Sequence, residues 1–101
     1  PARRGVYLAV AQPALLREGV RLVQQLRERR VCAMMDYDGK SLKAQLREAD
    51  KSGYQFVAVL GEAELKQQAL ALKDLEQGSE RTVPFARFVE ELAQQTKVCH
   101  H

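Results

Sequence analysis

Residues 36–53 read DYDGKSLKAQLREADKSG and decide how this chain folds. A polar turn opens this stretch and leads into an amphipathic helix that ends at Gly53, because glycine readily takes the left-handed conformation that follows a helix. Two short apolar runs, Val31–Met35 and Phe56–Leu60, flank the stretch and have the length and composition of buried strands. Two strands joined by one helix form a right-handed crossover unit, so the sequence predicts a parallel sheet.

The rest of the chain first repeats this rhythm and then changes it. A β-rich run and a stretch with helical spacing come before the crossover; a brief helical stretch, a hairpin and a final amphipathic helix come after it. In chain order these elements are Val6–Val10, residues 15–30, a stretch through Lys66, the strands Ala69–Leu75 and Glu80–Pro84, and a helix carrying Phe85, Phe88, Val89 and Leu92. The predicted fold is α/β: a five-stranded mixed sheet of three parallel βα units and a C-terminal antiparallel hairpin, flanked by three main helices.

Length and composition indicate one domain, 1–101, with a single core. Residues 1–4 and about 97–101 are expected to be flexible, and the opening proline and closing histidines favour a domain excised from a longer chain. A net charge of +3 and a pI near 9.1 allow contact with nucleic acid without requiring it. No apolar run has the length of a membrane span and no secretory signal opens the chain, so we expect no membrane partner and a cytoplasmic location.

Catalytic constellations are absent from the sequence. The only histidines, His100 and His101, close the chain, so no serine or cysteine has a base to activate it. Paired acidic residues lie among charged neighbours, which seldom supply the desolvated pocket that a general acid needs. The tripeptide Gly-Lys-Ser at 39–41 matches the end of a phosphate-binding P-loop, but Met34 stands where the first glycine is required. Metal ligands also lack a suitable pattern, so a binding module is the function class that remains.

Cations gather at the start and along one face of the central helix. Lys43, Arg47 and Lys51 recur every four residues and therefore form one stripe. With Lys40 in the preceding turn they can hold phosphates, and the first N–H groups of the helix can point at the same anion. Lys40, Lys43 and Arg47 are the predicted phosphate contacts. The alternative interpretation is a solvated helix face without a ligand.

Four segments carry a resemblance to a known family: Val6–Ala9, Met35–Gly39, Lys40–Gly53 and Phe56–Leu65. They resemble the C-terminal anticodon-binding domain of class II aminoacyl-tRNA synthetases, and most of all its bacterial histidyl branch. A helix that opens on Lys-Ser-Leu-Lys and ends in Ala-Asp-Lys-Ser-Gly is fairly specific to that branch, whereas Gly-Glu-x-Glu-Leu after the third strand is shared more widely. The family fold agrees with the predicted order of elements.

The resemblance implies a function in tRNA charging. This domain would bind the GUG anticodon loop of tRNA(His), while a separate catalytic domain of the longer protein attaches histidine with ATP and Mg. No cofactor is expected in the anticodon-binding domain itself. The longer protein would be a homodimer, and the isolated domain is expected to be monomeric because the missing catalytic part supplies most of the dimer contact.

The resemblance also implies candidate base contacts. In the threonyl branch a glutamate after the third strand and a basic residue on the next strand read an anticodon base, and the matching positions here are Glu64 and Lys73. A carboxylate can accept from guanine N1–H and N2–H, and an ammonium can donate to a base oxygen or a phosphate. Gln12, after the first strand, is a further candidate because its amide both donates and accepts. An asparagine of the threonyl branch is replaced here by Gly39, so that contact is not expected.

Rival interpretations stay open at this point. Glu64 can equally be a solvent-facing helix residue, Lys73 an exposed strand residue and Gln12 a turn-forming residue. The whole domain can be a stand-alone synthetase-like module that serves dimerisation or regulation. It can also be a small-ligand or nucleotide-binding α/β domain that uses the crevice at a topological switch of its sheet.

Overall fold

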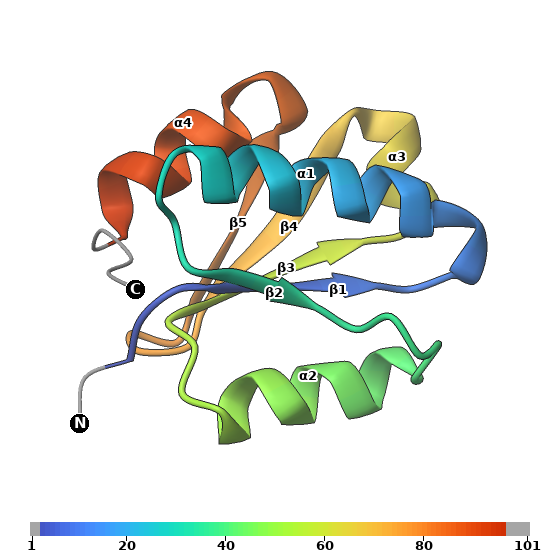
Figure 1. Ribbon diagram of the computed structural model, residues 1–101, viewed down its shortest axis with the longest axis horizontal. Coiled ribbons are helices and arrows are strands. Elements are labelled where there is room, and N and C mark those ends of the chain that lie inside the picture. The colour runs from blue at the N-terminus through green and yellow to red at the C-terminus, as the bar shows by residue number, and fades with distance from the viewer. Residues whose placement is uncertain (1–2, 97–101) are drawn as a thin grey trace.

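The computed structural model describes residues 3–96 and shows one mixed sheet between two layers of helices (Figure 1). Of the segments predicted to be flexible, residues 1–2 and 97–101 lie outside the described residues. The strands are β1 (Val6–Val10), β2 (Ala33–Met35), β3 (Phe56–Leu60), β4 (Ala69–Asp74) and β5 (Ser79–Pro84). The helices are α1 (Leu16–Glu28), α2 (Leu42–Lys51), α3 (Glu62–Gln67) and α4 (Phe85–Gln95), with a 3₁₀ turn at Pro13–Leu15.

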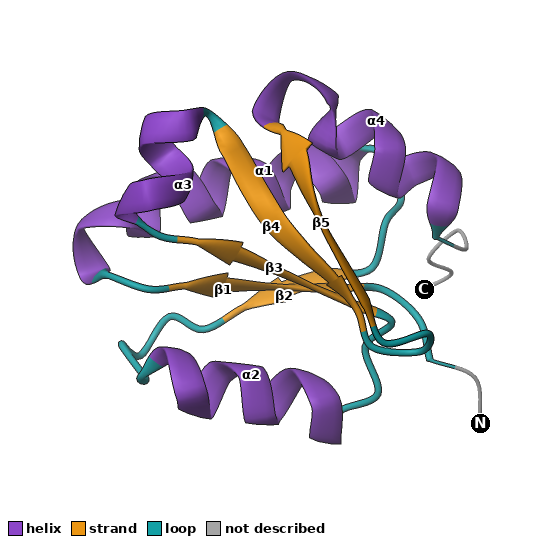
Figure 2. Ribbon diagram, turned by 180° about the vertical axis from the view of Figure 1, so that it is seen from behind, coloured by secondary structure: helices purple, strands orange, loops and turns teal. Residues whose placement is uncertain are grey.

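The strand order is β2-β1-β3-β4-β5, with β1 parallel to both of its neighbours and the hairpin β4–β5 antiparallel. Helix α1 crosses from β1 to β2 on one face of the sheet, and α2 crosses from β2 to β3 on the other (Figure 2). Helices α3 and α4 lie on the same side as α1 (Figure 2). The predicted five-stranded mixed sheet with three main helices is therefore confirmed, and α3 is the predicted brief helical stretch.

Two apolar cores fill the space between sheet and helices. The larger one lies under α1 and α4, where Leu26, Phe88 and Leu92 are fully buried. The smaller one lies under α2, where Tyr7 packs edge-on against Tyr54 with ring centroids 5.7 Å apart. Alternate residues of β1 and β3 supply the two cores, as expected for strands covered on both faces. The final-helix phenylalanine Phe88 is a core residue, as predicted.

One predicted strand is shorter than expected. The apolar run Val31–Met35 forms only a three-residue strand, because the backbone reverses at Arg30, which takes a left-handed φ of 63°. Val31 is left with an isolated bridge before the strand proper begins. Burial of Val31 in the larger core explains why its side chain is apolar although it lies outside the strand.

A buried glutamine joins the sheet to α2. The Gln45 amide accepts from Val10 N at 2.9 Å and donates to Val10 O at 2.9 Å and to Lys40 O at 2.8 Å. The side chain is almost completely buried. It thereby fixes the end of β1 against the first turn of α2 and the loop before it.

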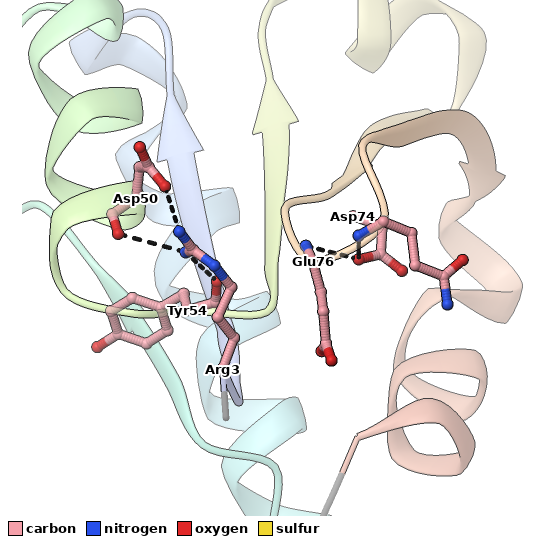
Figure 3. Close-up of polar contacts among 6 residues, drawn as sticks. Arg3, Asp50, Tyr54, Asp74 and Glu76 are labelled. Atoms are coloured by element: carbon pink, nitrogen blue, oxygen red, sulfur yellow. Dashed lines mark hydrogen bonds and ion pairs between the residues drawn. The ribbon is translucent and has the colours of Figure 1, made fainter. Parts of the chain in front are cut away.

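Two groups of polar contacts lie at the opposite end of the domain (Figure 3). The Arg3 guanidinium donates to the Asp50 side chain and to the Tyr54 carbonyl, which ties the first described residues to the end of α2. Asp74 accepts from the backbone N–H groups of Glu76 and Gln77 and so shapes the tight turn of the hairpin.

Replacing the buried amide tests its importance for stability. Gln45→Leu keeps the volume of the side chain but leaves Val10 N, Val10 O and Lys40 O without their partner. We expect the free energy of unfolding to fall by about 2–5 kcal/mol, because a buried unsatisfied group costs about 1–3 kcal/mol. Urea denaturation measures this, with Gln24→Ala on the exposed face of α1 as the control, expected within about 0.5 kcal/mol of the original chain. Equal stability of the two variants would contradict this role for Gln45.

Candidate nucleic-acid interface

A crevice opens where β1 and β2 end. The chain leaves β1 toward α1 on one face of the sheet and leaves β2 toward α2 on the other, so the two loops part at this edge (Figure 1). The cavity between them has a volume of about 120 Å³. Its lining includes Gln12, Asp36, Gly39, Lys40, Ser41 and Gln45. Crevices of this type at the carboxyl ends of parallel strands are the usual ligand sites of open α/β sheets.

The loop from β2 to α2 is held by its own hydrogen bonds. Asp36 is buried, and its Oδ2 accepts from the backbone N–H of Lys40 at 2.8 Å. Gly39 takes a φ of +75°, which the reversal between these residues requires. Ser41 is the N-cap of α2, because its Oγ accepts from Ala44 N at 3.2 Å. The polar turn predicted before this helix is therefore present, with Ser41 as the cap and Asp36 bracing the loop.

Gln12 and Glu64 come together at the adjacent strand ends of β1 and β3. Glu64 Oε1 and Gln12 Oε1 lie 2.8 and 3.8 Å from the point that a Cβ of Gly61 would occupy. Both atoms are acceptors, and Gln12 Oε1 is buried without a hydrogen-bond partner within residues 3–96. The site thus contains a carboxylate and an amide oxygen with no protein donor to satisfy the amide oxygen.

The cation stripe lies on the exposed face of α2. Lys40, Lys43, Arg47 and Lys51 are all exposed. The ion pairs of the described residues are Arg3–Asp50, Arg29–Glu90 and Arg81–Glu91. Among residues 3–96 the stripe therefore has no anionic partner, and its charge is available to a ligand.

Lys73 lies apart from Glu64. It pairs with Val57 near the start of β3, whereas Glu64 follows the end of that strand. Val57 and Leu60 are about 10 Å apart along an extended strand. Cross-strand partners share a face, so Lys73 points to the side of Val57 and α2. The prediction that Glu64 and Lys73 act together on one base therefore finds no support in their placement, because β4 runs back toward the opposite edge of the sheet.

Other parts of the molecule add little chemistry. A larger recess of about 360 Å³ lies at the hairpin end, and none of the predicted site residues lines it. Burial raises the pKa of Tyr7 to about 12, with further contributions from the nearby Asp36 and Glu48 carboxylates, so its hydroxyl stays neutral at pH 7.

Within residues 3–96 no group of three His, Cys, Asp or Glu side chains could hold a metal ion. The helices of that same part of the chain are all too short or too polar to cross a bilayer.

Sequence reasoning missed two residues that shape this site. Gly61 leaves room for the Glu64 carboxylate to fold back over the strand end, and a glycine directly after an apolar strand was the available signal. Gln45 lines the crevice and bonds to Val10 and Lys40 on its two sides. The only sign of this role in the sequence was a polar residue on the apolar side of α2. Both act by positioning other groups.

Comparison with known proteins agrees with this architecture. The family model described as "Anticodon binding domain" matches residues 5–95. A curated relative, histidine–tRNA ligase of Geobacillus thermodenitrificans, is 36% identical over 99 residues, which cover 96% of this chain and 23% of the relative. The chain thus spans about a quarter of the length of such relatives.

Solved structures give the same result. Apo histidyl-tRNA synthetase from S. aureus superposes with a TM-score of 0.84 at 25% identity, over 90% of this chain and 23% of that one. Histidyl-tRNA synthetase from Nostoc sp. PCC 7120 superposes with a TM-score of 0.79 at 29% identity, over 94% of this chain and 22% of that one. From the match over residues 5–95 and the shared fold, the chain belongs to the anticodon-binding domain family, with histidyl-tRNA synthetases among its relatives.

Proposed function

We propose that this chain binds the anticodon loop of a tRNA, and that its target is the GUG triplet of tRNA(His). The observation that carries the proposal is the unpartnered Gln12 oxygen beside the Glu64 carboxylate at the ends of β1 and β3. Guanine is the base whose Watson–Crick edge presents two neighbouring N–H donors, N1–H and N2–H. Proteins gain RNA sequence specificity mostly from such edges of unpaired bases.

Discrimination between bases at this site follows from the free-energy cost of leaving the Gln12 and Glu64 oxygens without a hydrogen-bond donor. When a guanine edge enters, Glu64 accepts from the base and the amide oxygen of Gln12 gains the donor that it lacks. An adenine at the same place presents an acceptor at N1 and no amino group at C2, so it repels the carboxylate instead. A well-made pair of contacts is worth about 1–3 kcal/mol of discrimination between bases.

Affinity comes from a different part of the same edge. Lys40 lines the crevice, and Lys43 and Arg47 follow it on α2. All three are exposed and lack anionic partners among the described residues. Such cations hold phosphates and position the RNA without reading its sequence. Lys73, on the α2 side of the sheet but away from Glu64, would contact the RNA backbone and no base.

The role in the longer protein rests on the relatives. These are named histidine–tRNA ligase or histidyl-tRNA synthetase, and this chain spans about a quarter of their length. We infer that the remaining part holds the catalytic domain, which attaches histidine with ATP and Mg and forms the homodimer. The anticodon-binding domain would then present a correctly bound tRNA to the catalytic domain.

Glu64→Gln tests base reading. The neutral amide keeps the shape but loses the charge-assisted acceptor, so binding of a GUG stem-loop should weaken by about 1–3 kcal/mol, or roughly 5- to 150-fold. A stem-loop carrying AUA in the same place should be affected much less, so discrimination between the loops should fall. Fluorescence anisotropy measures both affinities. Glu62→Gln, an exposed glutamate on the same helix, is the matched control. Equal losses for both loops would remove Glu64 from base reading.

Gly61→Ala tests the placement of that carboxylate. The φ of Gly61 is −131°, which any residue adopts, so the backbone is not strained. The added Cβ would lie 2.8 Å from Glu64 Oε1 and must displace it. We expect the GUG affinity to fall toward that of Glu64→Gln, and the double variant to lose nothing more, because both changes remove one interaction. If the two losses of affinity simply add in the double variant, this link is contradicted. As a check of folding, the free energy of unfolding of each variant should lie within about 1 kcal/mol of that of the original chain.

Arg47→Ala tests phosphate binding. Losing one phosphate contact should weaken every loop alike and reduce the slope of log K against log salt by about 0.7–0.9. Titrations at several salt concentrations provide that slope. Arg21→Ala removes an arginine that is also exposed, from α1 on the opposite face of the sheet, and should leave the slope unchanged (Figure 1). A slope that is the same for both variants would rule out phosphate contact by Arg47.

A further inference from the structure

An exposed tyrosine stands beside the proposed RNA site and has no structural task in the described part of the chain. Tyr37 is 54% exposed and follows β2 directly in the loop that leads to α2. Met34, on the short strand β2, is 41% exposed and is the other large hydrophobic residue on the described surface. A tyrosine ring left in water at a functional edge favours a contact that the free chain does not make.

The loop that carries Tyr37 is fixed on both sides of it. Asp36 is buried and bonded to the backbone N–H of Lys40, while the carbonyl of Lys40 accepts from the Gln45 amide. Tyr37 is therefore presented from a braced backbone, and its side chain has only two rotatable bonds to order on binding. Little conformational entropy is lost when such a ring is covered.

The surroundings of Tyr37 favour a nucleic acid over a protein partner. Lys40 lies three residues further along the same loop, and Lys43 and Arg47 continue the exposed cation stripe on α2. Asp38 is the one exposed carboxylate between Tyr37 and this stripe. Asp36 is buried and turned to the backbone. An aromatic ring next to a cationic track is the combination with which proteins hold single-stranded nucleic acid, because bases stack on the ring while cations follow the phosphates.

We propose that Tyr37 is a stacking platform for an unpaired base of the RNA loop bound at this edge. The proposal rests on the proposed function and adds a residue that contributes affinity without reading sequence. Every base has a π face, so stacking on Tyr37 is tolerant of base identity. This separates its role from that of Glu64, which accepts from the donors of one base, and from that of Arg47, which neutralises a phosphate.

The test compares three substitutions in the 101-residue chain. Tyr37→Leu keeps an apolar side chain but removes the ring, and it should weaken binding of the GUG and AUA stem-loops by the same factor, about 5- to 100-fold. Tyr37→Phe keeps the ring and should bind both loops nearly as well as the original chain. Met34→Ala removes the other exposed apolar side chain and should change neither affinity. The salt dependence should be the same for all of them, because no phosphate contact is lost.

Each outcome decides one point. Unchanged binding by Tyr37→Leu, while the original chain binds the GUG loop, would overturn stacking and leave the proposed function standing. That outcome would point to Tyr37 as a contact for another protein surface. A comparable loss in Met34→Ala, or a loss confined to the GUG loop, would also overturn it. Failure of the original chain to bind any stem-loop would instead refute the proposed function, and thermal denaturation of each variant confirms that the fold is retained.

Discussion

The bonds of the Gln45 amide are the constraint on which the site depends. They join the last residue of β1, the loop before α2 and the first turn of α2 itself. Because β2 pairs with β1 only as far as Leu8, and the chain then leaves the two strands toward opposite faces of the sheet, no strand ladder holds Val10 on the β2 side. An apolar residue at position 45 would fill the space but leave the peptide groups of Val10 unpaired. Gln45 therefore holds the end of β1 and the loop before α2 together, while Asp36 and Ser41 brace that loop from within.

The elements of the fold were predictable because their signals are local. Apolar runs, helical spacing and the signals of a hairpin are properties of short segments, and they placed all five strands and every helix in the right order. The start of β2 was harder to place, since the left-handed Arg30 depends on how α1 meets the sheet. The burial of Gln45 could not be predicted from the sequence either, because it depends on the peptide groups of Val10, which lies 35 residues away along the chain.

For the candidate site, too, some features could be predicted from the sequence and others could not. Gln12 and Glu64 meet because β1 and β3 are adjacent and parallel, with Val10 opposite Leu60, so that the residues after each strand arrive at one edge. The sequence predicted that these strands are parallel, whereas the strand order that makes β1 and β3 neighbours comes from the structure. Lys73 was assigned by matching a relative along the sequence, and the antiparallel return of β4 carries it away from Glu64. A predicted hairpin implies such a return, so topology was the better guide to which residues meet.

The proposed division of labour gives specificity a physical source within a small site. Cations and an exposed ring attract any single strand, and they would bind a wrong loop as readily as a right one. The buried acceptor of Gln12 works differently, since it is unsatisfied in the free chain and stays so when the entering base lacks a donor. A wrong base therefore forfeits the contact with Glu64 and leaves the buried Gln12 oxygen without a donor. Discrimination of this kind needs acceptors held in place before the RNA arrives, which agrees with their positions in the loop directly after β1 and on α3 directly after β3, whereas the charge lies on the exposed face of α2.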